Sequence, residues 1–213
     1  MNNRMRRGAP AVMAASLLLT ACGSSGNEGS GRIEGARQGS DVPTRSAEPS
    51  PEGPHFAFPS DVRVEVDAAS TGQKAPASLL RDHASAVQAV NLAAAKLDSD
   101  LPELKKYLGG DALAGWAGSI QQLKKKGQTI TGVVRYYDRD VKLNKRAGTA
   151  SIMYCEDQTN SYAKVLSTKK VRKTKPSIAD FISHVATMKK SSDGTWQMVV
   201  DRTFLKSARC QQS

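Results

Sequence analysis

The stretch "QTITGVVRYY", Gln128–Tyr137, marks the point where the pattern of the chain changes from helical to extended. β-Branched and aromatic residues dominate it, as is typical of strands. Four later stretches of the same kind predict further strands at residues 148–156, 161–167, 180–190 and 195–205. We expect a turn at residues 157–160 and a hairpin across residues 191–194, so that these strands form an antiparallel meander.

Residues before this stretch predict helices. Apolar residues recur at spacings of three and four over 78–97, on a stripe that includes His83. A short helix is expected within 98–110 and a third helix at 111–127, and "DVRVEVD" at 61–67 alternates like an edge strand or an extended arm. Helices followed by a meander indicate an α+β fold. We predict three N-terminal helices packed in a curved antiparallel sheet of four to six strands.

Particular motifs in the strand region carry a family resemblance. "TITGVVRYYD", "AGTASIMYCEDQTNSYAK", "GTWQMVV" and a terminal "ARC" resemble a group of actinobacterial lipoproteins to which no activity is assigned. The order of elements resembles the cone-shaped, nuclear transport factor two-like fold. The resemblance implies that fold, and a pairing of Cys155 with Cys210 belongs to its pattern. It implies no activity for this chain.

The N-terminus has the parts of an export signal. A start with three arginines and no acid precedes a short apolar run from Ala11 to Leu19, which is too short to span a bilayer. The exit, "LTAC" at 19–22, resembles the bacterial lipobox. The resemblance implies cleavage after residue 21 and acylation of Cys22 with palmitate-type chains. The alternative is an ordinary secreted protein with a chance cysteine.

Composition divides the mature chain into two parts. Residues 22–60 are rich in Gly, Ser, Pro and Glu, which predicts a disordered tether. Residues 61–213 form one expected domain, with 25 Lys and Arg against 15 Asp and Glu, a net charge near +10. A basic domain suits acidic partners. We expect no nucleic acid among them, because the protein is expected outside the membrane and its basic runs lack interleaved aromatic residues.

Two further cysteines remain once Cys22 is assigned to lipid. Cys155 and Cys210 are an even pair in an oxidising compartment, which predicts a disulfide. Two free thiols are the alternative. The bridge would close a loop of about 55 residues and contribute roughly 4 kcal/mol in the chain-entropy model. No cysteine or histidine spacing indicates a metal site, and no motif indicates a cofactor.

Candidate chemistry is sparse. Catalysis in a cone-shaped pocket would draw on Asp, His and Tyr side chains. We assign no catalytic residue, and name His184, Asp138 and Tyr136 as the candidates that a catalytic interpretation would use. Strand alternation predicts that Tyr136 and Tyr137 face opposite sides of the sheet, and that Trp196 and Asp201 do so as well. His83 and His184 also fit satisfied core histidines, and Asp138 fits turn chemistry.

The run "KKVRKTK" at 169–175 concentrates positive charge between two expected strands. Its five cations are Lys169, Lys170, Arg172, Lys173 and Lys175. A solvated loop is one interpretation. The other is a contact with anionic headgroups or a wall polymer, where each basic residue near such a surface contributes about 1 kcal/mol.

Two functions remain open from the residues alone. One is an extracytoplasmic lipoprotein, anchored to the cell membrane, whose domain binds a ligand, an envelope protein or an anionic wall polymer without catalysis. The other is a cone-fold isomerase or cyclase acting on a small apolar substrate. A reachable Asp or His opposite a Tyr hydroxyl would favour the enzyme.

Overall fold

A computed structural model describes residues 54–69 and 75–212, which belong to one compact unit. The expected signal segment, Cys22 and residues 23–53 of the expected tether lie outside the described residues. None of the described helices is long and apolar enough to cross a membrane.

The described elements follow the predicted order of helices and then strands. The helices are α1 (Ala77–Lys96), α2 (Pro102–Tyr107), α3 (Gly110–Lys125) and α4 (Ala208–Gln211), with a 3₁₀ turn, η1 (Ile178–Asp180). The strands are β1 (Val62–Val66), β2 (Gln128–Asn144), β3 (Thr149–Val165), β4 (Val171–Arg172), β5 (Phe181–Lys190) and β6 (Trp196–Leu205).

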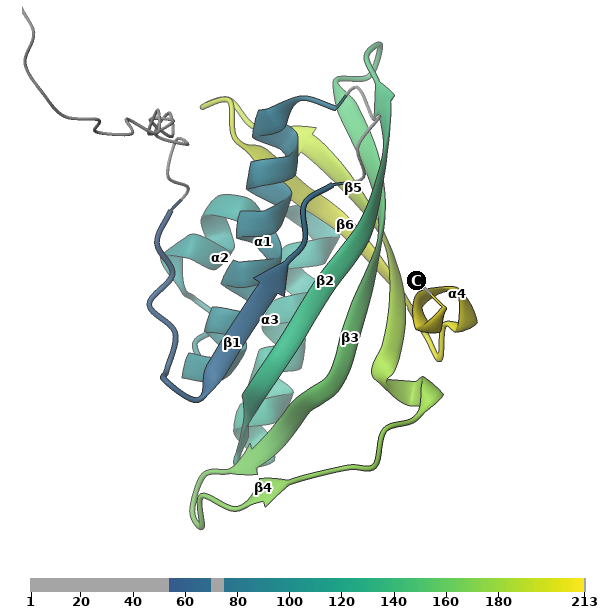
Figure 1. The fold of residues 1–213 in the computed structure, drawn as a ribbon. Coiled ribbons are helices and arrows are strands. Elements are labelled where there is room, and N and C mark those ends of the chain that lie inside the picture. The colour runs from purple at the N-terminus through teal and green to yellow at the C-terminus, as the bar shows by residue number, and fades with distance from the viewer. Residues whose placement is uncertain (1–53, 70–74, 213) are drawn as a thin grey trace, which may run out of the picture. The chain divides into compact units, whose positions relative to one another are not determined.

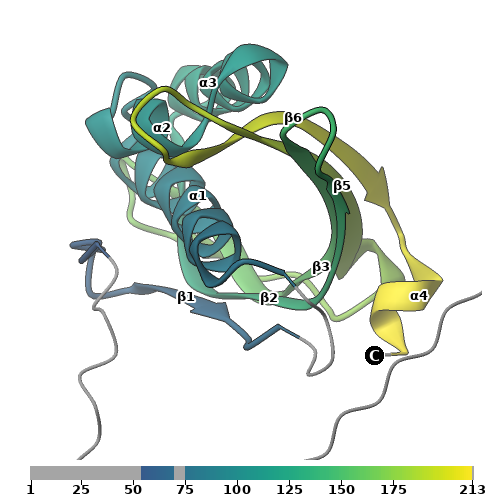
Figure 2. The same ribbon diagram turned by 90° about the horizontal axis from the view of Figure 1, so that it is seen from above.

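One curved sheet of six strands holds the domain together. Its order is β1-β2-β3-β5-β6, with β4 paired to the end of β3. Figures 1 and 2 show the sheet bending around α1, with α2 and α3 beside β6. The predicted α+β class with a curved sheet is therefore confirmed. The antiparallel expectation is wrong at one edge, because β1 pairs with β2 in parallel.

The two central strands are longer than predicted. β3 is continuous, so the expected turn at 157–160 is wrong. Its turn-forming residues instead make a bulge, in which the Thr159 backbone N–H donates to the Asp157 carboxylate at 2.8 Å. β2 likewise continues past Tyr137 through a bulge at Asp138, whose φ is 51°. Bulges bend a strand and increase its twist, so these residues help to curve the sheet.

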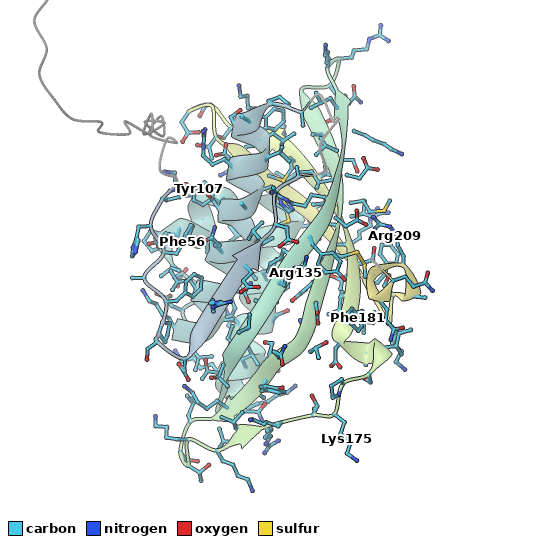
Figure 3. The ribbon with its side chains drawn as sticks, in the orientation of Figure 1. Phe56, Tyr107, Arg135, Lys175, Phe181 and Arg209 are labelled. Carbon is cyan, nitrogen blue, oxygen red and sulfur yellow. A yellow bond between two sulfur atoms is a disulfide. The ribbon has the colours of Figure 1, made fainter. Side chains whose placement is uncertain are left out.

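The core lies between the concave face of the sheet and the helices. Leu79, Leu92 and Leu104 from the helices are fully buried there with Ile152 and Met188 from the sheet. The folded region also begins earlier than the predicted boundary at residue 61. Phe56 is buried, and its ring lies 6.4 Å from that of Tyr107 (Figure 3). Residues 54–60 therefore belong to the domain, because "HFAF" supplies apolar anchors.

The convex face carries a second, smaller core. Cys155 and Cys210 form the predicted disulfide, which ties α4 to β3. Tyr137 packs against the pair and donates its hydroxyl to the carbonyl of Cys210. Phe181 completes this cluster near α4, as Figure 3 shows. Tyr136 points into the main core instead, so the predicted opposition of Tyr136 and Tyr137 is confirmed.

Candidate functional site

A buried histidine bridges two carboxylates on the concave face of the sheet. His184 on β5 is 1% exposed, and its Nε2 lies 2.8 Å from Glu156 Oε2 on β3. Its Nδ1 lies 3.3 Å from both carboxylate oxygens of Asp201 on β6. Both ring nitrogens are therefore used within the protein.

A register shift brings Asp201 to this site. The pairing of β5 with β6 is irregular between Thr187 and Met188, so one extra residue of β6 lies opposite them. Alternation beyond that point is reversed, and Asp201 faces the core on the same side as Trp196 and Met198. The prediction that Trp196 and Asp201 face opposite ways is wrong for this reason.

Aromatic donors hold the carboxylates in place. Tyr154 stacks on His184 with ring centroids 4.6 Å apart, and its hydroxyl donates to Asp201 at 3.3 Å. Trp116 of α3 donates its indole N–H to Asp201 at 3.2 Å. The network thus ties β3, β5 and β6 to a helix.

A second set of hydrogen bonds surrounds Glu156. The Tyr136 hydroxyl donates to its Oε1 at 3.2 Å, and Gln158 Nε2 donates to the same atom at 2.6 Å. Asn91 of α1 donates to the Tyr136 oxygen at 2.8 Å and to the carbonyl of Val87 at 2.9 Å. These contacts fix the amide orientation of Asn91, since both partners accept from its nitrogen.

The surroundings set the charges of the buried groups. Burial alone would lower the pKa of His184, but the hydrogen bonds and charges of Asp201 and Glu156 outweigh burial and raise it to about 9. His184 is therefore an imidazolium at neutral pH. Burial and the charge of Glu156 raise the pKa of Tyr136 well above its usual value. Tyr136 consequently stays a neutral donor.

Two pockets adjoin this network, and Trp116 lines both. The Glu156 pocket has a volume of about 260 Å³. Its lining residues are Val90, Asn91, Ala94, Trp116, Leu123, Thr129, Ile130, Tyr136, Glu156, Gln158, Ser161, Tyr162 and Ala163. The Asp201 pocket, of about 200 Å³, is lined by residues that include Trp116, Asp201 and Thr203. His184 lines neither pocket and connects the carboxylates that do.

The predicted candidates do not all meet. His184 and Tyr136 both contact Glu156. Asp138 lies outside this network, in the β2 bulge, where its carboxylate pairs with Arg209 at 2.6 Å. His83 is fully buried against Tyr154, with ring centroids 4.6 Å apart, and burial together with the charge of Arg139 lowers its pKa to about 3. His83 is thus a neutral core residue.

The most important site residue was missed in the sequence. Glu156 follows Ala150, Ile152 and Tyr154 at alternate positions of one strand, so an acid continues an apolar face. That alternation was a usable signal, but the predicted turn at 157 placed Glu156 at a strand end. Among the described residues, no group of three His, Cys, Asp or Glu side chains is arranged to hold a metal ion.

The basic run lies beside the Glu156 pocket, because Arg172 on β4 pairs with Ala163 on β3, which lines that pocket. Its residues are on β4 and the loops beside it, and all five cations are exposed. Figure 3 shows Lys175 on the loop that follows β4, at the end of the domain where that strand lies. Lys173 also lies over the ring of Tyr162, 6.0 Å from its centroid.

Comparison with known proteins gives distant structural likenesses. No protein-family model and no curated protein matches the sequence. The intermembrane-space region of the chloroplast protein ARC6 is similar at 15% identity and a TM-score of 0.41, over 58% of this chain and 92% of that one. A ketosteroid isomerase-like protein from Erwinia carotovora atroseptica SCRI1043 is similar at 17% identity and a TM-score of 0.38, over 62% and 98%. We draw no conclusion on activity from either.

Proposed function

We propose that this protein is a binding module that holds a small molecule in the Glu156 pocket. We place it, through the lipobox and Cys22, as a lipoprotein on the extracytoplasmic face of the cell membrane. We also assign its domain to the cone-shaped, nuclear transport factor two-like class, on the strength of the curved sheet around α1. The pocket is the observation that carries the proposal.

The pocket has the composition of a small-molecule site. Val90, Leu123 and Ile130 contribute apolar surface, while Asn91 and Glu156 contribute polar groups. Ligand sites combine apolar walls with a few fixed polar groups in this way, and the pockets that bind drug-sized ligands have volumes of roughly 300–1,000 Å³. A volume of about 260 Å³ therefore suits a ligand smaller than a drug.

Binding is better supported than catalysis. His184 has both nitrogens occupied and lines neither pocket, so it cannot exchange a proton directly with a ligand there. Tyr136 is a weak acid because burial and Glu156 raise its pKa. The buried network therefore favours a role as a fixed, charged wall of the pocket over a role in proton transfer to a ligand.

A cone-fold enzyme of the isomerase or cyclase class stays the second candidate. One observation favours it: Glu156 is a carboxylate that reaches the pocket and lies beside the Tyr136 hydroxyl. Chemical change of a bound compound over time, followed by mass spectrometry and abolished by Glu156→Gln, would favour the enzyme. A compound recovered unchanged would favour the binding module.

The basic run supplies a second contact with the membrane in this proposal. Its five exposed cations face solvent, and their charge suits anionic headgroups or a wall polymer. Such a contact would weaken with salt because exposed charges are screened beyond a Debye length.

A ligand screen by thermal unfolding tests the pocket. A compound present at 100 times its Kd should raise the melting temperature by about 5–11 °C. Leu123→Trp should remove that gain, because the larger ring fills the pocket. Gln121→Trp is the matched control, since Gln121 is exposed on the same helix and does not line the pocket. Equal gains in both variants would contradict binding in the Glu156 pocket.

A further inference from the structure

Two polar side chains that line the Glu156 pocket, Asn91 and Tyr136, use all their hydrogen-bond donors within the protein. Both N–H groups of Asn91 are used, one on Val87 and one on Tyr136. The hydroxyl proton of Tyr136 is used on Glu156. An amide has two N–H donors and a hydroxyl has one, so neither side chain has a donor left for a ligand.

Acceptors remain at the same place. Asn91 Oδ1 has no hydrogen-bond partner among the residues that the structure describes, although the side chain is only 8% exposed and lines the pocket. Glu156 Oε2 accepts from His184 alone, which leaves a lone pair. Gln158 donates its amide nitrogen to Glu156, so its carbonyl oxygen is also left to accept. A ligand that donates protons would satisfy these atoms.

The charge of the pocket is negative. No Lys, Arg or His is among the described residues that line it, and Glu156 is its one carboxylate. Behind that wall, the single positive charge of His184 is shared between Glu156 and Asp201. An imidazolium between two carboxylates leaves a net charge of −1 on these three side chains. This contrasts with the net positive charge of the domain as a whole.

Aromatic rings line the remainder of the pocket. Trp116, Tyr136 and Tyr162 all contribute to its lining, and the ring of Tyr162 already has Lys173 over it, 6.0 Å from its centroid. The faces of such rings attract cations, and Trp attracts them most strongly. The apolar side chains nearby suit the hydrocarbon body of an amphiphilic ligand.

We infer that the ligand of the Glu156 pocket is a small organic cation, an ammonium group on an apolar body. Its N–H donors would contact Asn91 Oδ1, the free lone pair of Glu156 and the Gln158 carbonyl, while its body lies against Val90, Leu123 and Ile130. This inference rests on the proposed binding function and adds the class of ligand.

A matched series of probes tests the charge preference. Benzylamine, benzyl alcohol and benzoate share one ring and differ in the charge of the attached group. Isothermal titration of the purified protein at pH 7 should give the tightest binding for benzylamine, by about tenfold over the alcohol and more over benzoate. Equal or tighter binding of benzoate would overturn the cation assignment while leaving the pocket as a site. Binding of none of the three would contradict both.

Charge insertion separates this inference from a loss of folding. Gln158→Lys would place a cation beside Glu156 and should weaken benzylamine binding at least about tenfold. Asn160→Lys adds the same charge at an exposed position of the same strand outside the pocket, and should leave binding unchanged. An equal loss in the two variants would show a general charge effect and overturn the inference. Melting temperatures of both variants verify that they are folded.

Discussion

At the scale of single residues, the site depends on His184 and the two carboxylates that it joins. An uncharged histidine could donate to one carboxylate only, whereas the imidazolium donates to both Glu156 and Asp201. Removing one partner of a buried pair leaves the other charge unpaired, which costs about 3–5 kcal/mol. The network therefore keeps its charges as a unit.

The raised pKa of His184 predicts a loss of stability in mild alkali. The folded protein holds this proton up to about pH 9, whereas an unfolded histidine releases it near 6.5. The stabilisation is thus complete below pH 6.5 and is lost as the pH rises to 9, by about 3 kcal/mol. Urea unfolding at several pH values measures this. His184→Gln should flatten the slope, and a flat profile in the unmodified protein would show that His184 is neutral.

The lowered pKa of His83 predicts the opposite slope in mild acid. Below pH 6.5 His83 binds a proton in the unfolded chain, whereas in the folded protein it stays neutral until the pH falls to about 3. Stability should therefore fall by about 2 kcal/mol between pH 6.5 and 5. His83→Phe, which keeps an aromatic ring beside Tyr154, should remove this slope in the same unfolding assay. Retention of the slope in the variant would assign it to other groups.

At the scale of elements, the regular parts of the strands were predicted from the sequence, whereas the strand bulges were not. Alternation in "FISHVATMKK" and "TWQMVVDRTFL" predicted β5 and β6 correctly. The bulges at Asp138 and at 157–160 could not be predicted, because turn residues look the same in a bulge and in a chain reversal. The bulge in β6 falls at Val199, where no turn-forming residue marks it. Each bulge reverses which side chains face the core.

That reversal explains why only part of the site was predicted. His184 and Tyr136 lie in regular alternation, so both were among the candidates. Asp201 faces the core only because β6 contains an extra residue. Glu156 was hidden by the expected turn, and Asn91 lies on a helix 45 residues before Tyr136, a pairing that only tertiary packing creates.

Gly132 on β2 lies where any side chain would crowd the backbone of the neighbouring strand, so we expect its replacement to destabilise the protein. Its φ is +97°, and an added Cβ would overlap the carbonyl oxygen of Asn160 on β3. Gly132→Ala should therefore lower the free energy of unfolding by at least about 2 kcal/mol. Gly118→Ala is the control, because open space surrounds that helical glycine and alanine favours helix by ~1 kcal/mol. Equal stability of the two variants, measured by urea unfolding, would contradict this role for Gly132.

At the scale of the whole molecule, the proposal joins an anchor, a basic surface and a ligand pocket. The proposed lipobox ends at Cys22, and Phe56 near the start of the described domain packs on Tyr107. Two or more acyl chains hold a protein on a bilayer durably, whereas one holds it only marginally. The pocket would then sample small molecules near the membrane surface.

Replacement of Cys22 tests the anchor. Cys22→Ala should move the protein from the membrane fraction to the soluble fraction of the producing cells, because the acylated thiol is gone. Fractionation followed by immunoblotting measures the change, and labelling with a fatty-acid analogue should mark only the unmodified protein. Membrane association of the variant at high salt would contradict lipid anchoring at Cys22.

The two tryptophans of the chain allow the binding site to be tested directly. Trp116 lines the Glu156 pocket and donates its indole N–H to Asp201, whereas Trp196 is buried and does not line that pocket. Two-dimensional ¹H–¹⁵N NMR shows one indole signal for each. Titration with benzylamine should shift the Trp116 signal along a saturable curve and leave Trp196 in place. A Trp116 signal that stays fixed, or a shift at Trp196 alone, would contradict the Glu156 pocket as the binding site.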